Sequence, residues 1–257
     1  MISCKEYAEF KKSQIKNAPK HMSLSIIQVG NDFGSAAYVR GKLKDCEEVG
    51  IQTYLYKVDD TITQDEFGNL VMKAALNNGG IIVTMPLPLH LHIRKEWFKP
   101  WQDVDGLCYN YYDSCTAEGI VNWLDFNNFD FESSHFVVVG RGKLVGKPLA
   151  EMLIRAGATV TVCNSHTNTQ LITSFIETAD VIVSATGHRN WLYCYVNPRR
   201  KRLWVDVGIN TDENGKICGD LDTNWLTACG QEVTPVPGGV GLLTRVTLLE
   251  HLTQVEE

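Results

Sequence analysis

The stretch VVVGRGKLVGKP, residues 137–148, decides the fold class of this chain. Consecutive valines are typical of a buried strand, and the glycines that follow them are typical of a tight turn that opens a helix. Glycines at such a turn let the backbone approach a pyrophosphate, and the start of the helix offers N–H donors and a positive dipole end. The spacing G-x-G-x-x-x-G is one residue longer than the usual dinucleotide pattern. The motif alone therefore leaves an ordinary strand-to-helix turn as the alternative.

The segments around this turn alternate between strand and helix. Strands are expected at 135–140, 158–163, 179–187 and 202–210, and helices at 148–156 and 169–178. Strands that are continuously apolar suit a parallel sheet covered by helices on both faces. The sequence therefore predicts a Rossmann-like half.

The N-terminal part of the chain shows the same alternation. Strands are expected at 24–29, 52–58 and 80–85, and a helix is expected at 36–49, ending at Gly50. The last segment of the chain, 242–255, is also expected to be a helix. A β-α-β-α-β order favours another parallel sheet. We therefore predict two α/β halves, with a boundary near residues 115–119.

Composition and charge narrow the class of protein. A net charge of -6 argues against a general nucleic-acid binder, and the basic run 199–202 is interpreted as a solvated loop. No apolar stretch reaches the roughly 18 to 20 residues of a membrane helix, and the polar N-terminus resembles no signal peptide. The eight cysteines form no CxxC pair, so we expect reduced thiols, no metal site and a cytoplasmic location.

The strand end after the glycine-rich turn bears on the choice of cofactor. NAD is usually bound by an Asp or Glu about 20 residues after such a turn, but residues 161–167, TVCNSHT, contain no acid. A carboxylate would repel a 2′-phosphate, whereas Arg141 and the Ser165 hydroxyl could bind one. We therefore expect NADP, with NAD as the weaker alternative.

Tyr38 and Lys42 are four residues apart in a predicted helix and share one face of it. A lysine sheltered in a cleft can exchange protons, and a neighbouring tyrosine can stack on a flat heterocycle. The spacing alone also permits an exposed lysine beside a half-buried tyrosine.

Several collinear motifs resemble those of the methylenetetrahydrofolate dehydrogenase/methenyltetrahydrofolate cyclohydrolase family. They are the segment 29–51 with S-x-x-Y-V-x-x-K-x-K, GIIVTMPLP at 80–88, DVDG at 103–106, Cys115-Thr116, the turn at 140–148, ATG at 185–187, DVGIN at 206–210 and TPVPGGVG at 234–241. Together they span about residues 24–250.

The resemblance implies a fold, a reaction and an assembly. It implies a folate-binding catalytic domain, 1–118 plus 245–257, a Rossmann-like NADP-binding domain, 119–244, and an active-site cleft between them. The implied activity is NADP-dependent oxidation of 5,10-methylenetetrahydrofolate and hydrolysis of the methenyl product to 10-formyltetrahydrofolate. A cytoplasmic homodimer that serves purine biosynthesis is also implied, with tetrahydrofolate derivatives as partners and neither nucleic acid nor membrane.

The resemblance also assigns residues by position. The catalytic set is Lys42, Tyr38, Asp105 and Thr84. The substrate-binding set adds Val83, Met85, Pro237, Gly238, Gly239, Val240 and Gly241. The cofactor-binding set is Gly140, Arg141, Gly142, Val145, Gly146, Ser165, Thr186, Gly187 and Ile209. No metal is implied.

The chain departs from the family pattern at positions that matter. Thr84 stands where the family has a Gln that helps position the lysine, so a dehydrogenase without the hydrolytic step is one alternative. Gly142, Asn164, Ala117, Leu242 and Arg245 are further departures. A non-catalytic homologue that binds folate or nucleotide is the alternative from another class.

Overall fold

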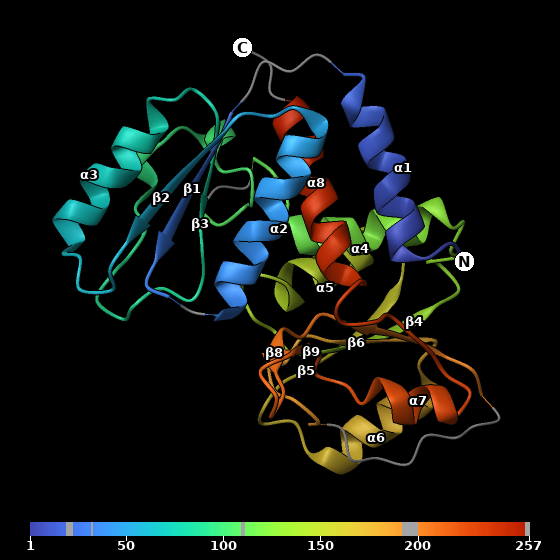
Figure 1. The fold of residues 1–257 in the computed structure, drawn as a ribbon. Helices are drawn as coiled ribbons and strands as arrows, with labels where there is room; N and C mark the ends of the chain where they lie inside the picture. Colours follow the sequence, from blue (N-terminus) through green and yellow to red (C-terminus); the bar gives the residue numbers. More distant parts are fainter. Residues whose placement is uncertain (19–22, 32, 109–110, 192–199, 255–257) are drawn as a thin grey trace. The chain divides into compact units, whose positions relative to one another are not determined.

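The computed structural model describes residues 1–18, 23–31, 33–108, 111–191 and 200–254, without the side chains of residues 33–35 (Figure 1). The chain divides into two compact units. The N-terminal unit comprises Ala8–Cys115 with Arg245–Glu257, and the C-terminal unit comprises Met1–Tyr7 with Thr116–Thr244. Each contains a parallel sheet and helices, which confirms the predicted two-domain α/β fold.

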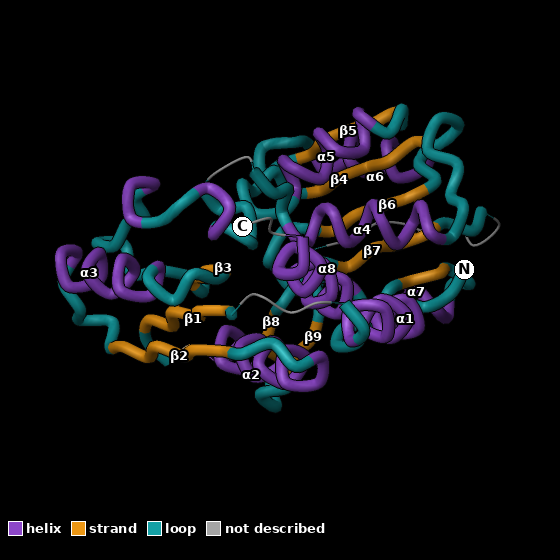
Figure 2. Tube along the Cα trace, turned by 90° about the horizontal axis from the view of Figure 1, so that it is seen from above, coloured by secondary structure: helices purple, strands orange, loops and turns teal. Residues whose placement is uncertain are grey.

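The N-terminal unit contains a parallel sheet in the order β2-β1-β3. Its strands are β1 (Leu24–Val29), β2 (Thr53–Val58) and β3 (Gly80–Val83). Leu24 pairs with both Thr53 and Gly80, so the strands start in register. Figures 1 and 2 show the sheet between α2 (Phe33–Val49) and α3 (Gln64–Ala75). Because β1 is buried at every position, it forms the centre of this unit.

Local sequence signals explain where these two helices begin and end. Thr63 caps α3, and its hydroxyl and backbone exchange hydrogen bonds with Glu66 in a capping box. The buried face of α3, including Phe67 and Val71, packs against the β1 and β3 side chains. Gly50 follows α2 with a φ of +80°, a left-handed conformation that favours glycine. Two short 3₁₀ helices, Lys95–Trp97 and Pro100–Gln102, follow β3.

The C-terminal unit contains a five-stranded parallel sheet in the order β10-β7-β6-β4-β5. Its strands are β4 (His135–Val139), β5 (Thr159–Cys163), β6 (Val181–Ser184), β7 (Leu203–Asp206) and β10 (Glu232–Val233). An antiparallel pair, β8 (Asn210–Thr211) and β9 (Ile217–Cys218), follows β7. The fully buried Trp204 packs in the core on one side of this sheet.

The remaining helices connect or cover these strands. They are α1 (Cys4–Lys16), α4 (Cys115–Phe126), α5 (Gly146–Arg155), α6 (Thr169–Thr178), α7 (Thr223–Ala228) and α8 (Val240–Gln254). α5 follows the glycine-rich turn and buries Leu149 and Leu153. The strand-turn-helix order predicted for residues 137–148 is therefore confirmed.

The structure confirms most predicted elements and corrects the bounds of some. The strand at 24–29 and the helix at 169–178 have the predicted bounds. The strand expected at 202–210 ends at Asp206, because the Asp206 carboxylate accepts the N–H of Gly208 and turns the chain. The strand expected at 80–85 ends at Val83, just before the Met85–Pro86 peptide bond. Helices α1, α3, α4 and α7 were not predicted.

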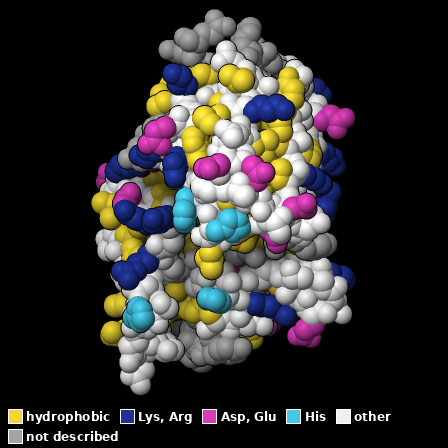
Figure 3. All heavy atoms as spheres, turned by 90° about the vertical axis from the view of Figure 1, so that its left-hand side faces the viewer, with side chains coloured by type: hydrophobic (Ala, Val, Ile, Leu, Met, Phe, Trp, Pro, Cys, Tyr) yellow, Lys and Arg dark blue, Asp and Glu magenta, His cyan; other side chains and the backbone are white. Residues whose placement is uncertain are grey.

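The surface of the described residues carries both signs of charge. Figure 3 shows basic and acidic side chains interspersed on one face, with hydrophobic side chains scattered among them. The seven described cysteines form no disulfide with one another, while Cys194 and Arg199 lie outside the described residues. No helix within the described ranges is both long enough and apolar enough to cross a membrane.

Candidate functional site

Tyr38, Lys42 and Asp105 come together in the N-terminal unit. The Lys42 side chain is only 2% exposed, and its Nζ lies 3.5 Å from Oδ2 of Asp105. The same Nζ lies 4.6 Å from the centroid of the Tyr38 ring, a cation–π distance. The predicted shared face of Tyr38 and Lys42 is confirmed, and the alternative of an exposed lysine is excluded. A buried ammonium with one carboxylate and one aromatic ring is a group that can bind or exchange protons with a polar ligand.

The loop that carries Asp105 is fixed by buried groups on either side of that residue. Asp103 is 2% exposed, and its carboxylate accepts the N–H groups of residues 107 and 108 at 3.0 and 2.7 Å. The carbonyl oxygen of Val104 accepts from two buried side chains, Cys115 at 3.1 Å and His251 at 2.8 Å. Since these hydrogen bonds hold the residues before and after it, Asp105 is kept close to Lys42. Sequence reasoning missed this support, although DVDG was one of its motifs.

An ion-pair network lies along α2, close to Lys42 in sequence. Asp45 is 7% exposed and binds Nε of Arg245 at 3.0 Å and Nζ of Lys12 at 3.1 Å. An added Cβ at Gly41 would collide with the Arg245 guanidinium, so the glycine makes room for it. Arg245, a departure from the family pattern, is thus explained by a carboxylate partner on α2.

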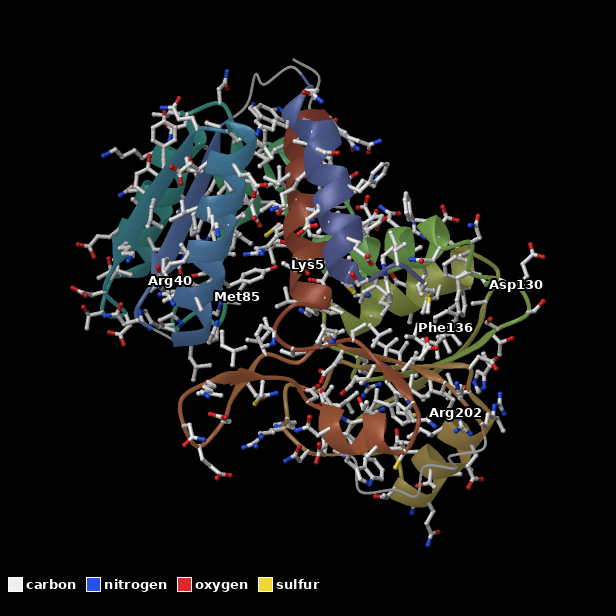
Figure 4. All side chains as sticks on the ribbon, turned by 45° about the vertical axis from the view of Figure 1, so that its right-hand side comes forward. Lys5, Arg40, Met85, Asp130, Phe136 and Arg202 are labelled. Atoms are coloured by element: carbon white, nitrogen blue, oxygen red, sulfur yellow. The ribbon has the colours of Figure 1, made fainter. Side chains whose placement is uncertain are left out.

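The other predicted substrate-binding residues belong to two places in the chain. Val83 is buried at the end of β3, Thr84 is half-buried, and Met85 is 37% exposed. The Thr84 N–H donates to the Ile27 carbonyl at 3.0 Å, which extends the pairing of β1 with β3 beyond the end of β3. Figure 4 labels Met85, just past β3, and Arg40, on α2. The run at 237–241 belongs mainly to the turn before α8 in the C-terminal unit, where Pro237, Gly238 and Gly241 are exposed and Gly239 and Val240 are buried.

The glycine-rich turn is shaped by close backbone approach. A Cβ at Gly140 would strike the Ala185 carbonyl, and one at Gly146 would strike the Gly140 carbonyl. Gly142 is exposed, with no heavy atom within 4 Å of the position of an added Cβ. Val145 precedes α5 and makes no side-chain cap hydrogen bond. The turn therefore offers an open backbone surface at Gly142 and a helix start without a side-chain cap, both of which suit an anion-binding turn.

The remaining predicted cofactor residues follow β4, β5, β6 and β7. Arg141 and Ser165 are exposed, and Asn164 accepts the His166 N–H within the turn after β5. Thr186 is half-buried, while Gly187 and Ile209 are exposed. All of them lie past the carboxyl ends of parallel strands, where open α/β sheets bind ligands.

Two fully buried carboxylates, Asp206 and Asp220, hold the segments that follow β6 and β7 at the carboxyl ends of the strands. Neither carboxylate was predicted. Asp206 accepts the N–H groups of Gly208, Asp220 and Leu221 at 2.9 to 3.0 Å. Burial raises the pKa of the Asp206 carboxyl above its usual value, although the three backbone N–H groups oppose the shift. Asp220 accepts hydrogen bonds from the turn after β6 and from Asn210. Its side-chain partners are 10 to 36 positions away along the sequence, so no local spacing of residues indicates this set of hydrogen bonds.

Comparisons with known proteins match most of the chain. A family model for the tetrahydrofolate dehydrogenase/cyclohydrolase catalytic domain matches residues 2–105, and one for its NAD(P)-binding domain matches residues 114–257. The bifunctional protein FolD of Acidovorax sp. (strain JS42) is 38% identical over 252 residues, which cover 91% of this chain and 87% of that relative.

Solved structures agree with this match. The bifunctional enzyme FolD of Campylobacter jejuni, a methylenetetrahydrofolate dehydrogenase/cyclohydrolase, has a TM-score of 0.85 and 33% identity, with 98% of this chain and 96% of that chain covered. The Trypanosoma brucei enzyme, solved with NADP cofactor and inhibitor, has a TM-score of 0.85 and 25% identity, with 98% and 95% covered. The chain therefore belongs to the tetrahydrofolate dehydrogenase/cyclohydrolase family of enzymes.

Proposed function

We propose that this protein oxidises 5,10-methylenetetrahydrofolate with NADP and hydrolyses the resulting 5,10-methenyltetrahydrofolate to 10-formyltetrahydrofolate. The observation that carries the proposal is Lys42, a nearly buried ammonium held between the Tyr38 ring and the Asp105 carboxylate. Family membership supplies the reaction, and the related bifunctional enzymes named above support both of its steps.

Each residue of the cluster has a distinct part in this proposal. Tyr38 stacks on the flat pterin, and Asp105 accepts hydrogen bonds from the pterin amino and N–H groups. Lys42 transfers the proton when water attacks the amidinium carbon of the methenyl form and the C–N bond of the ring opens. Val83, Thr84 and Met85 add substrate contacts in the same unit, and we also assign the run at 237–241 to substrate binding. Because hydride transfer needs chiefly a fixed distance and angle, the oxidation depends mainly on this orientation.

The residues of the C-terminal unit fit a nicotinamide dinucleotide. The close backbone packing that glycine permits at positions 140 and 146, the open position at Gly142 and the start of α5, which has no side-chain cap, suit the pyrophosphate. Arg141 and Ser165, both exposed, would hold the 2′-phosphate of NADP, and Val145, Thr186, Gly187 and Ile209 would contact the rest. When bound, NADP supplies the acceptor for the hydride that leaves the methylene carbon. NAD lacks the 2′-phosphate that Arg141 would bind, so NADP is the proposed cofactor.

The same proposal covers domains and assembly. We assign residues 1–118 with 245–257 to folate binding and residues 119–244 to NADP binding. A homodimer is supported by β5, which ends the sheet order and exposes Thr159 and Val162 along that strand. The described cysteines form no disulfide with one another, which supports a cytoplasmic enzyme. Its product would supply one-carbon units for purine biosynthesis.

The decisive experiment is an assay of both activities with NADP and NAD in parallel. We expect reduction of NADP that depends on methylenetetrahydrofolate, and decay of the methenyl absorbance faster than its spontaneous hydrolysis. A purified, folded protein that binds NADP or folate without turnover would overturn the proposal and favour a non-catalytic homologue.

A dehydrogenase without the hydrolytic step is the second candidate. Thr84 is the observation that favours it. Its side chain is shorter than that of the Gln in the family pattern, and its hydroxyl offers a single donor. In that case the assay would show NADP reduction while the methenyl absorbance persists.

A further inference from the structure

Asp220 is a fully buried carboxylate that accepts hydrogen bonds from three places in the C-terminal unit. Its Oδ2 accepts the Ser184 hydroxyl at 2.9 Å, the Thr186 N–H and hydroxyl at 2.8 Å, and the Gly187 N–H at 3.2 Å. Its Oδ1 accepts the Asn210 amide at 2.9 Å. A carboxylate in a dry interior is costly unless its lone pairs are used, and here they are filled by donors.

The neighbouring carboxylate fixes Asp220 itself. Asp206, the last residue of β7, accepts the Asp220 N–H at 3.0 Å. Glycines let these segments approach: a Cβ at Gly208 would strike the Asp220 carboxylate, and one at Gly219 would strike the Asp206 carboxylate. The end of β6, the end of β7 and the start of β8 are therefore joined through one buried network.

The network determines which atoms of the turn after β6 face outward. The N–H groups of Thr186 and Gly187 are used by Asp220, so these amides are not available to a phosphate. Gly187 has a φ of +66°, with no heavy atom within 4 Å of where a Cβ would lie. Ile209, adjacent to Asn210, is 52% exposed. An open glycine and an exposed isoleucine are suited to the face of a flat ring rather than to an anion.

We infer that Asp220 is a positioning residue for the nicotinamide dinucleotide: it holds the turn at 186–187 and Asn210 so that Gly187 and Ile209 present a fixed apolar surface to the cofactor. The inference rests on the proposed function and deepens it. Asp220 does not touch the cofactor; it acts through the residues that do. Loosening this network lowers cofactor affinity and leaves the chemistry at Lys42 intact, since Lys42 and Asp105 belong to the other unit.

The test is the variant Asp220→Asn, which keeps the size of the side chain but replaces one acceptor oxygen with an NH₂ donor. We expect the Kd for NADP, measured by fluorescence titration, to rise at least tenfold, and the KM for NADP to rise with it. Hydrolysis of the methenyl substrate without cofactor should stay within twofold. Far-UV circular dichroism at the assay temperature checks the fold.

Asp222→Asn is the matched control, because Asp222 caps α7 through the Trp225 N–H and asparagine caps helices as well as aspartate does. It should leave the Kd for NADP within twofold. Asn210→Ala removes a single donor from Asp220 and should raise the Kd about threefold to tenfold; it decides the question if Asp220→Asn fails to fold.

Two results would overturn the inference. One is a folded Asp220→Asn variant that binds NADP as tightly as the wild type. The other, where Asp220→Asn does not fold, is an Asn210→Ala variant with unchanged affinity. A wild-type protein that binds no NADP would instead overturn the proposed function, and the inference with it.

Discussion

Lys42 differs from the other lysine of α2, Lys44, in its burial and in its charged neighbour. The Lys42 side chain is 2% exposed and its Nζ lies 3.5 Å from Oδ2 of Asp105, whereas Lys44, two residues along α2, is exposed. If Lys42 moves the proton in the hydrolytic step, Lys42→Ala should lower that rate at least about 100-fold, the usual contribution of a positioned acid or base. Lys44→Ala should stay within twofold. Equal rates of methenyl hydrolysis in the wild type and Lys42→Ala would remove Lys42 from the mechanism.

Asp180 makes a residue-scale contribution to stability that depends on pH. Partial burial opposes its ionisation, but hydrogen bonds from the His135 N–H and from Arg200, both at 2.9 Å, outweigh burial and lower the pKa of the carboxyl below its usual value. A depressed pKa gives stability that is present above the unfolded value and lost as pH falls through the folded value.

We therefore expect Asp180→Asn to unfold at a temperature a few degrees lower than the wild type at pH 6, about 1 kcal/mol or less since this pair is partly exposed. The difference in Tm should shrink as pH falls below about 4. Thermal scans of both proteins from pH 6 to pH 3 measure it, and a difference that stays constant over that range would contradict the account.

At the scale of elements, an ion pair connects α2 and α8. Asp45 on α2 pairs with Arg245 on α8 and with Lys12 on α1. Because Asp45 is only 7% exposed, removing one partner leaves a poorly hydrated charge. A double-mutant cycle with Asp45→Ala and Arg245→Ala should give a coupling energy of about 1 to 2 kcal/mol. Urea unfolding measures it, and strictly additive effects would show that the pair contributes nothing.

Elements also show where sequence reasoning succeeds and where it stops. The bounds of β1 and α6 could be predicted because apolar runs and helical spacing are local. The capping box at Thr63 and Glu66 was an available signal for α3 that was not used. The end of β7 could not be predicted, because the Asp206 carboxylate turns the chain with help from residues 220 and 221.

For the molecule as a whole, motifs predicted the two α/β units and the cluster of Tyr38, Lys42 and Asp105, of which the first two lie one helical turn apart. Motifs could not predict what supports the cluster. Cys115 and His251 reach the Val104 carbonyl from 11 and 147 positions away, and Asp220 joins segments that no spacing relates. Motif residues can be recognised in the sequence, while the residues that hold them in place become visible only in the fold.

The relative rates of NADP reduction and methenyl hydrolysis are a property of the whole enzyme. Substitution of Thr84 tests whether residue 84 sets them. Thr84 is half-buried, follows β3, and is held by its N–H to Ile27. Thr84→Gln restores a longer side chain with amide donors and an acceptor, so better orientation of Lys42 should raise methenyl hydrolysis. A gain of about tenfold corresponds to about 1.4 kcal/mol of transition-state stabilisation. NADP reduction should change less than threefold, since it depends on orientation of the folate rather than on the proton of Lys42.

Parallel assays of the wild type, Thr84→Gln and the isosteric Thr84→Val separate the two activities. If hydrolysis is the same in Thr84→Gln as in the wild type, residue 84 does not set the balance, and the hydrolytic step depends on Lys42 and Asp105 without it.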